Sequence, residues 1–263
     1  MKKMIMCMTV MCLAIQGLSS TPQGWLEVYL DSHFPEQDVE RLREDFKDMK
    51  KLRECMVGLV GSPPLSATYE RAGEFKRRFG VSDKAMETVL IDIINTAGVK
   101  NGWKKRHGPD DPLDGTADHQ LTWGLMWLGF CAETEGKKFL AGIATNSVMD
   151  GEFRSSAIAA YMTRADAQEV RDTLPRFLAD GTLRPSFDIY LCAMWHYDKA
   201  GDNPQKREAI LSIVSAALTN EEERKAFTQA DKKLSEYSKE YADSPQRKTA
   251  LERMKIFSEQ KTP

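Results

Sequence analysis

The chain has 263 residues, of which 41% are hydrophobic and 29% are charged, a composition typical of folded globular proteins and unlike that of disordered ones. Its 37 Lys and Arg residues nearly balance its 39 Asp and Glu residues, which gives a formal net charge of −2. Because this balance supplies no long-range attraction for polyanions, we expect no binding to nucleic acid.

The first 20 residues have the order of a secretory signal peptide. Two lysines follow the first methionine, residues 4–18 are uncharged and mostly apolar, and Ser19 and Ser20 supply small residues for a peptidase. The alternative is a membrane anchor, but the apolar run is shorter than the ~20 residues that a spanning helix needs. We therefore expect cleavage near Ser19 or Ser20. The mature chain, 21–263, is then predicted to be secreted or periplasmic, with no membrane span.

Three cysteines remain after this cleavage, Cys55, Cys131 and Cys192. In an oxidising compartment an odd number leaves at least one thiol unpaired. Each cysteine has apolar neighbours in the sequence, so we predict buried, structural residues rather than catalytic thiols. The sequence does not decide whether any two of them form a disulfide.

Strand patterns are nearly absent, whereas helix starts and stops recur, so we predict an all-α fold. In the first half of the chain, helices are expected at 22–33, 39–59, 66–79 and 83–97. Gly80 and Gly98 are the predicted C-terminal stops of the last two, and Ser82 is the predicted N-cap between them. Because their connection is so short, these two helices are expected to pair in antiparallel fashion.

The predicted helices resume after a break at residues 99–116, which are rich in Gly, Pro and Asp. Eight further helices are expected, at 116–133, 137–147, 151–164, 165–179, 185–200, 204–218, 220–241 and 244–260. Residues 21–263 therefore form either a single all-helical domain or one that is subdivided at the 99–116 loop. A capping box is expected from Thr219 to Glu222.

A short motif near residue 150 resembles a known family. From Asp150 to Ile158 an acidic turn leads to Arg154 and then to a small residue, Ala157. A second, similar segment, which we call the second echo of this pattern, starts at Glu169. This pattern resembles the second helix of HEAT-type repeats over about residues 116–219. The resemblance implies helix pairs stacked in a superhelix, with arginines bracing the turns and a surface that binds proteins. The echoes lie closer together than the ~40 residues of a HEAT unit, so an irregular layered α/α domain fits equally well.

The loop at 99–118 is the first candidate for a functional site, because long loops on helical scaffolds concentrate binding residues. Its basic half contains the partner-binding candidates Trp103, Lys104, Arg106 and His107. Its acidic half contains Asp110, Asp111, Asp114 and His119, which could supply oxygen and nitrogen ligands to a metal. The spacing is not that of a calcium loop, and a solvated loop whose aspartates cap turns is the simpler interpretation.

Two aromatic segments admit a functional and a structural interpretation. Trp123 and Trp127 lie four residues apart among leucines and could form a sugar-stacking platform, but core packing is the expected role. His196 follows an apolar run and is expected to be a partly buried histidine rather than a general base.

The chain contains no serine-hydrolase elbow, no zinc-protease motif and no phosphate-binding glycine loop. We therefore expect a non-enzymatic binding or scaffold protein of the cell envelope, without a cofactor, that uses a helical-repeat surface to bind a protein partner. The alternative is a small secreted hydrolase, with or without a metal, whose site lies in the 99–119 loop.

Overall fold

The computed structural model describes residues 38–61, 69–104, 115–179 and 204–242, and the chain divides into two units, Met1–Val39 and Glu40–Pro263. The expected signal peptide at 1–20 lies outside the described residues. So do the helices predicted at 22–33, 185–200 and 244–260.

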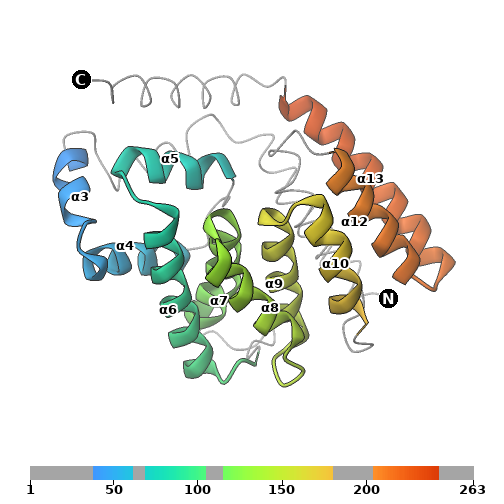
Figure 1. Ribbon diagram of the computed structural model, residues 1–263, viewed down its shortest axis with the longest axis horizontal. Coiled ribbons are helices and arrows are strands. Elements are labelled where there is room, and N and C mark those ends of the chain that lie inside the picture. The colour runs from blue at the N-terminus through green and yellow to red at the C-terminus, as the bar shows by residue number, and fades with distance from the viewer. Residues whose placement is uncertain (1–37, 62–68, 105–114, 180–203, 243–263) are drawn as a thin grey trace. The chain divides into compact units, whose positions relative to one another are not determined.

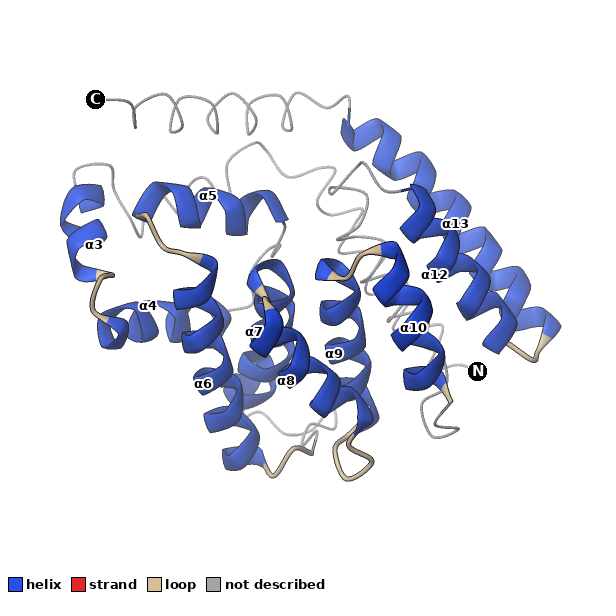
Figure 2. Cartoon of the chain, in the orientation of Figure 1, coloured by secondary structure: helices blue, strands red, loops and turns tan. Residues whose placement is uncertain are grey.

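The predicted all-α class is confirmed, because every extended regular element in the described part of the chain is an α-helix and no strand occurs there (Figures 1 and 2). The helices are α3 (Val39–Asp45), α4 (Met49–Gly61), α5 (Tyr69–Phe79), α6 (Asp83–Asn101), α7 (Gly115–Cys131), α8 (Thr134–Thr145), α9 (Gly151–Arg164), α10 (Ala167–Leu178), α12 (Pro204–Ala217) and α13 (Glu221–Ala242).

The single helix predicted at 39–59 is wrong, because the chain breaks between α3 and α4. Asp48 starts the second helix by accepting a hydrogen bond from the amide of Lys50 at 2.8 Å, in the manner of an N-cap. Phe46 lies in the break and packs against Phe75 and Phe79, with ring centroids 6.0 and 5.2 Å away. Phe46, which the sequence pattern placed on the apolar face of one long helix, therefore anchors the turn between two helices.

The stop predicted at Gly98 is also wrong, whereas Gly80 ends α5 with a left-handed φ of 68° as predicted. Helix α6 continues to Asn101 and ends at Gly102, whose φ is 67°. The amides of Gly102 and Trp103 bond the carbonyls of Val99 and Gly98 at 3.3 and 2.9 Å, which is a Schellman motif. Gly98 instead makes room for the Trp103 ring, which would lie 2.2 Å from a Cβ at that position.

The hydrophobic core lies between α6, α7 and α9. Helix α7 packs against both α6 and α9, α8 packs against α9, α10 packs against α12, and α4 covers α6 and α7. The stripe of Met86, Val89, Leu90, Ile93 and Ile94 on α6 is buried. Helices α7 and α9 approach closely, because a Cβ on Gly129 would lie 2.9 Å from the Cα of Ala160.

The antiparallel pair expected from α5 and α6 does not form. Helix α5 lies across the end of α6 (Figure 1) and contacts α7, where Phe75 meets Trp127 edge-on with ring centroids 6.1 Å apart. Trp127 is only 6% exposed, which confirms its predicted role in the core.

The N-cap of α13 is Asn220, whose side chain accepts a hydrogen bond from the amide of Glu222 at 2.9 Å. The N-cap therefore lies one residue after Thr219, the residue at which the capping box was predicted to start.

The two described cysteines are free thiols. Cys131 is fully buried and its thiol donates to the carbonyls of Trp127 and Leu128 at 3.6 Å. Burial raises the pKa of Cys55 to about 12 and raises the pKa of Cys131 still more. Both therefore remain protonated at neutral pH. Cys131 is buried as predicted, whereas Cys55 is half-buried, and Cys192 lies outside the described residues.

Candidate functional site

Several helix ends meet at one end of the helix stack, where α6, α8 and α10 begin and α7 and α9 finish. Their side chains contact one another there through Glu87, Arg164 and Lys137. We call this region the Glu87 end. Helix starts carry unpaired amide groups and helix ends carry unpaired carbonyls, so the Glu87 end needs polar partners.

Glu87 on α6 caps the start of α8. Its Oε1 accepts hydrogen bonds from the amides of Glu133, at 2.9 Å, and Gly136, while its Oε2 pairs with Lys84 at 3.0 Å. The residue has no exposed surface. Burial acts to raise the pKa of this carboxyl, but the bonds from Lys84, Gly136 and Glu133 outweigh it and lower the pKa overall. Gly136 is required here, because a Cβ would lie 2.5 Å from Oε1.

Arg164 at the end of α9 joins three further elements. Its Nε donates to the carbonyl of Ala132 at 3.2 Å, just beyond the end of α7, and its guanidinium also pairs with Asp83 at 3.2 Å. Asp83 is the first residue of α6 and pairs with Lys76 of α5 through its other oxygen. Four helices are thus held together by one arginine and one aspartate.

Glu169 in the first turn of α10 has two partners. It accepts from the amide of Asp166 at 2.8 Å and completes a capping box, and both of its carboxylate oxygens accept from Lys137 Nζ of α8 at 2.7 Å. The amide of Glu169 bonds Asp166 in return, and this is the main reason why the pKa of Asp166 is lowered. The side chains of Lys137 and Glu169 are 23% and 36% exposed, so solvent or a ligand can reach the pair.

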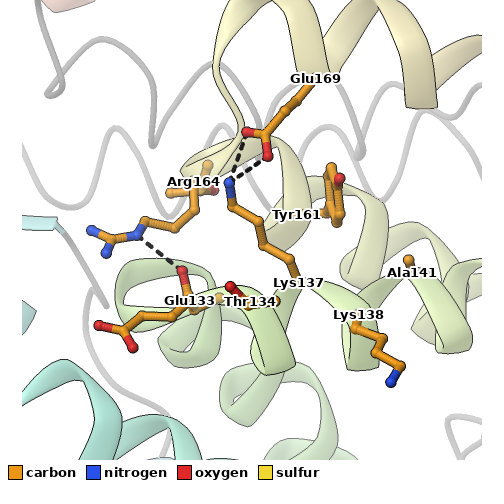
Figure 3. Close-up of a pocket in the computed structure, with 10 residues that line it drawn as sticks. Glu133, Thr134, Lys137, Lys138, Ala141, Tyr161, Arg164 and Glu169 are labelled. Atoms are coloured by element: carbon orange, nitrogen blue, oxygen red, sulfur yellow. Dashed lines mark hydrogen bonds and ion pairs between the residues drawn. The ribbon is translucent and has the colours of Figure 1, made fainter.

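A groove of about 680 Å³ lies at this ion pair. Figure 3 shows Lys137 reaching from α8 to Glu169, with Tyr161 of α9 beside it and Lys138 pointing away. The lining is Ala132, Glu133, Thr134, Lys137, Lys138, Ala141, Tyr161, Thr163, Arg164 and Glu169. Burial and the nearby charge of Glu169 raise the pKa of Tyr161, so its hydroxyl stays protonated. The ring of Tyr161 is fixed edge-on against Phe177 at 5.4 Å.

Lys206 of α12 is a buried cation next to this groove. It is 5% exposed, and its Nζ donates to the carbonyl of Thr163, a lining residue, at 3.1 Å. Burial lowers the pKa of Lys206 to about 8, and the charge of Lys137 adds to this effect, while Glu169 and Asp166 oppose it. A large part of its population is therefore uncharged at mildly alkaline pH.

The groove presents cations, carboxylates and a phenol at fixed positions on three helices. Such a surface can bind a segment of complementary polarity, because Lys137, Arg164 and Glu169 are already held by hydrogen bonds before the ligand arrives. In the described ranges, no group of three or more His, Cys, Asp or Glu side chains could hold a metal ion. None of the described helices has the length and apolar character that a membrane crossing requires.

The groove is not the site that the sequence predicted. Of the partner-binding candidates, Trp103 is half-buried against Gly98 and Lys104 is exposed, while Arg106 and His107 lie outside the described residues. The metal candidates Asp110, Asp111 and Asp114 also lie outside them. His119 lies within α7, but its side chain is not among those described.

The residues that line the groove were not among the predicted site residues, although one pair of them carries a recognisable sequence pattern. An aspartate followed three residues later by a glutamate, as at 166 and 169, is a capping-box pattern that marks the start of α10. Arg154, which the HEAT-like motif singled out, is buried and its Nε donates to the carbonyl of Ala144 at the end of α8 at 3.1 Å. It braces the α8–α9 turn.

The described fold therefore defines an all-α protein whose helix ends surround a polar groove. Comparison with protein-family models, with curated proteins and with solved structures finds no match to this chain.

Proposed function

We propose that the chain is an exported binding or scaffold protein of the cell envelope, built as an irregular HEAT-like stack of helices, which holds a segment of a protein partner in the groove between α8, α9 and α10. One observation carries this proposal. The ion pair of Lys137 and Glu169 crosses from α8 to α10 at the groove, where it is partly exposed and held in place by the capping box of α10.

Fixed charges of both signs favour a polypeptide ligand. A protein segment brings amides, carbonyls and side chains of either charge, and the groove offers a partner for each, with Lys138 and Glu133 exposed at its edge. Partly exposed ion pairs of this kind contribute little to stability. In an interface, however, the same charges select the partner and fix its register.

Cross-linking tests the groove directly. A photoreactive residue at Ala141 or Lys138, both in the lining, should give a discrete adduct with the partner in cells that express the protein. The same residue at Lys232, exposed on α13, is the matched control and should give none. Lys138→Glu should weaken the adduct at Ala141 by about ten-fold, because it reverses one interface charge, and Lys232→Glu should leave it unchanged. Equal adducts at Ala141 and Lys232 would refute the groove as the binding site.

The proposed export depends on residues 1–20 and has its own test. Protein recovered from the envelope fraction should begin at or near residue 20 or 21 when its N-terminus is sequenced. Recovery only inside the cell, with the first 20 residues still attached, would contradict export while leaving the groove experiment valid.

A further inference from the structure

The last turn of α5 contains an arginine whose hydrogen-bonding edge is buried. Nε and Nη2 of Arg77 are both buried, and among the residues that the structure describes neither atom has a hydrogen-bond acceptor. The residue as a whole is half-buried, so the guanidinium lies close to the protein surface. A buried polar group costs free energy unless it is paired, and the cost is greatest for a charged group. The edge of Arg77 formed by Nε and Nη2 therefore calls for an acceptor.

The guanidinium of Arg77 rests on its own helix. Nη2 lies over Gly73, one turn earlier in α5, where a Cβ would be only 3.0 Å from it. Gly73 thus leaves the room that the guanidinium occupies. Because this seat is one turn of a half-buried helix face and not a packed pocket, rotation about the side-chain torsions of Arg77 can present its edge to an incoming ligand.

The carboxylates described near the end of α5 already have cations of their own. Asp83, at the start of α6, pairs with Lys76 and with an arginine of α9. Glu40 of α3 pairs with Arg43, which in turn bonds a backbone carbonyl in the last turn of α5. Neither carboxylate is bonded to Arg77, so both leave its edge to another acceptor.

The chemistry of this edge selects the ligand. The N–H groups on Nε and Nη2 lie on one side of the guanidinium plane and point in parallel directions, so they can donate together to two oxygens of one carboxylate or phosphate group. Arginine also stays charged at every pH at which the protein is folded. A spherical anion offers a single acceptor, and a neutral carbonyl offers no charge, so an oxyanion matches the edge best.

We propose that Arg77 is the central contact of an oxyanion-binding site at the end of α5, which takes a phosphate or carboxylate group through Nε and Nη2. The two groups share the pair of oxygens that the edge requires, and they are told apart by their affinities. Arg77 is not among the residues that line the groove, so the proposal does not depend on the proposed function.

Calorimetric titration of the full chain with inorganic phosphate, and separately with acetate, tests the proposal at an ionic strength held constant with chloride. Wild type should bind the preferred anion with a Kd on the order of 1 mM, as expected for two charge-assisted hydrogen bonds. Arg77→Lys keeps the charge but loses the two parallel donors, and it should weaken binding by about ten-fold. Tighter binding of phosphate would assign the site to a phosphoryl group, and tighter binding of acetate would assign it to a carboxylate.

Arg53→Lys is the matched control. Arg53 on α4 is also half-buried, but its guanidinium already bonds Asp92 and Thr96, so this variant should bind the anion like wild type. Circular dichroism confirms that each variant is folded. Absence of wild-type binding to both anions, or equal losses in the Arg53 and Arg77 variants, would overturn the proposal.

Glu74→Gln tests for an acceptor within the chain. Glu74 precedes Arg77 by three residues, the spacing at which opposite charges can pair along a helix. This variant should bind the anion as wild type does. Binding that appears only after Glu74→Gln would overturn the proposal, because the edge of Arg77 would then belong to that carboxylate.

Discussion

The two ends of the helix stack are closed by different means. At the Glu87 end, the partners come from distant parts of the chain: Glu87 bonds an amide 49 residues away and Arg164 pairs with a carboxylate 81 residues away. At its C-terminal end, α6 is closed by its own next residues through Gly98, Gly102 and Trp103. The start of α8 is thus satisfied by a tertiary contact, whereas the end of α6 is satisfied locally. The Glu87 end should therefore respond most strongly to a change of charge, and the C-terminal end of α6 to a change of volume.

The largest effect is expected at Glu87. Glu87→Ala leaves the amides of Glu133 and Gly136 without their acceptor. We therefore expect the free energy of unfolding, measured in urea, to fall by about 3 kcal/mol. Glu87→Gln keeps one carbonyl oxygen and should lose only about 1 kcal/mol. Equal losses for the two variants would mean that the negative charge, which both variants remove, matters at this end rather than the acceptor oxygen that glutamine keeps.

The same carboxyl makes a prediction about acid. Because the folded protein lowers the pKa of Glu87, its ionised form stabilises the fold above the unfolded pKa, and this contribution disappears as the pH falls through the folded pKa. Wild type should therefore lose its advantage over Glu87→Gln below about pH 4.

An intermediate effect is expected at Lys206. Its pKa is about 8 in the folded chain and 10.5 in the unfolded one, so the burial cost is complete below pH 8 and is relieved as the pH rises from 8 toward 10.5. Lys206→Met should raise the free energy of unfolding at pH 7 by on the order of 2 kcal/mol, and its advantage should shrink by pH 10. Ionisation of the unfolded Cys55 and Cys131 thiols acts in the opposite direction over this range. The quantity to compare is thus the difference between wild type and variant, and a constant difference would exclude Lys206 as its source.

The smallest effect is expected at Gly98. Gly98→Ala places a Cβ against the Trp103 ring and should cost about 1–2 kcal/mol, since overpacking outweighs the better helix propensity of alanine. In a Trp103→Ala background the same change should instead stabilise by up to about 1 kcal/mol. This reversal of sign, measured as a double-mutant cycle in urea, separates volume from propensity. Additive effects would show that the ring does not rest on Gly98.

The fold class and most helices were predictable from the sequence, because periodic apolar residues and caps act locally. Ser82 accepts from the amide of Ala85 at 3.1 Å as its position indicates, and α9 has the predicted bounds, Gly151–Arg164. The errors arose where a tertiary contact changed the role of a residue. Gly98 was predicted to end a helix, but it lies within α6 and makes room for the Trp103 ring. Phe46 was predicted to lie on the apolar face of a helix, but it packs in the break between α3 and α4.

The groove was less predictable than the helices. Lys137 and Glu169 lie 32 residues apart, and no short motif contains both of them. Lys206 reads as a surface lysine at a helix start, and only the packing of α12 buries it. Contacts of this range depend on how the helices stack, which a periodic pattern does not specify.

The close contact between the Glu87 carboxylate and the backbone of Gly136 restricts which residues can occupy both positions. A methyl group at position 136 would occupy the space of the Glu87 carboxylate oxygen. Positions 87 and 136 are therefore expected to covary. When related sequences are aligned, substitution of the glycine should coincide with replacement of the glutamate and with a new serine, threonine or aspartate at the head of α8. A lineage that kept glutamate opposite alanine would need a shifted carboxylate or a displaced α8.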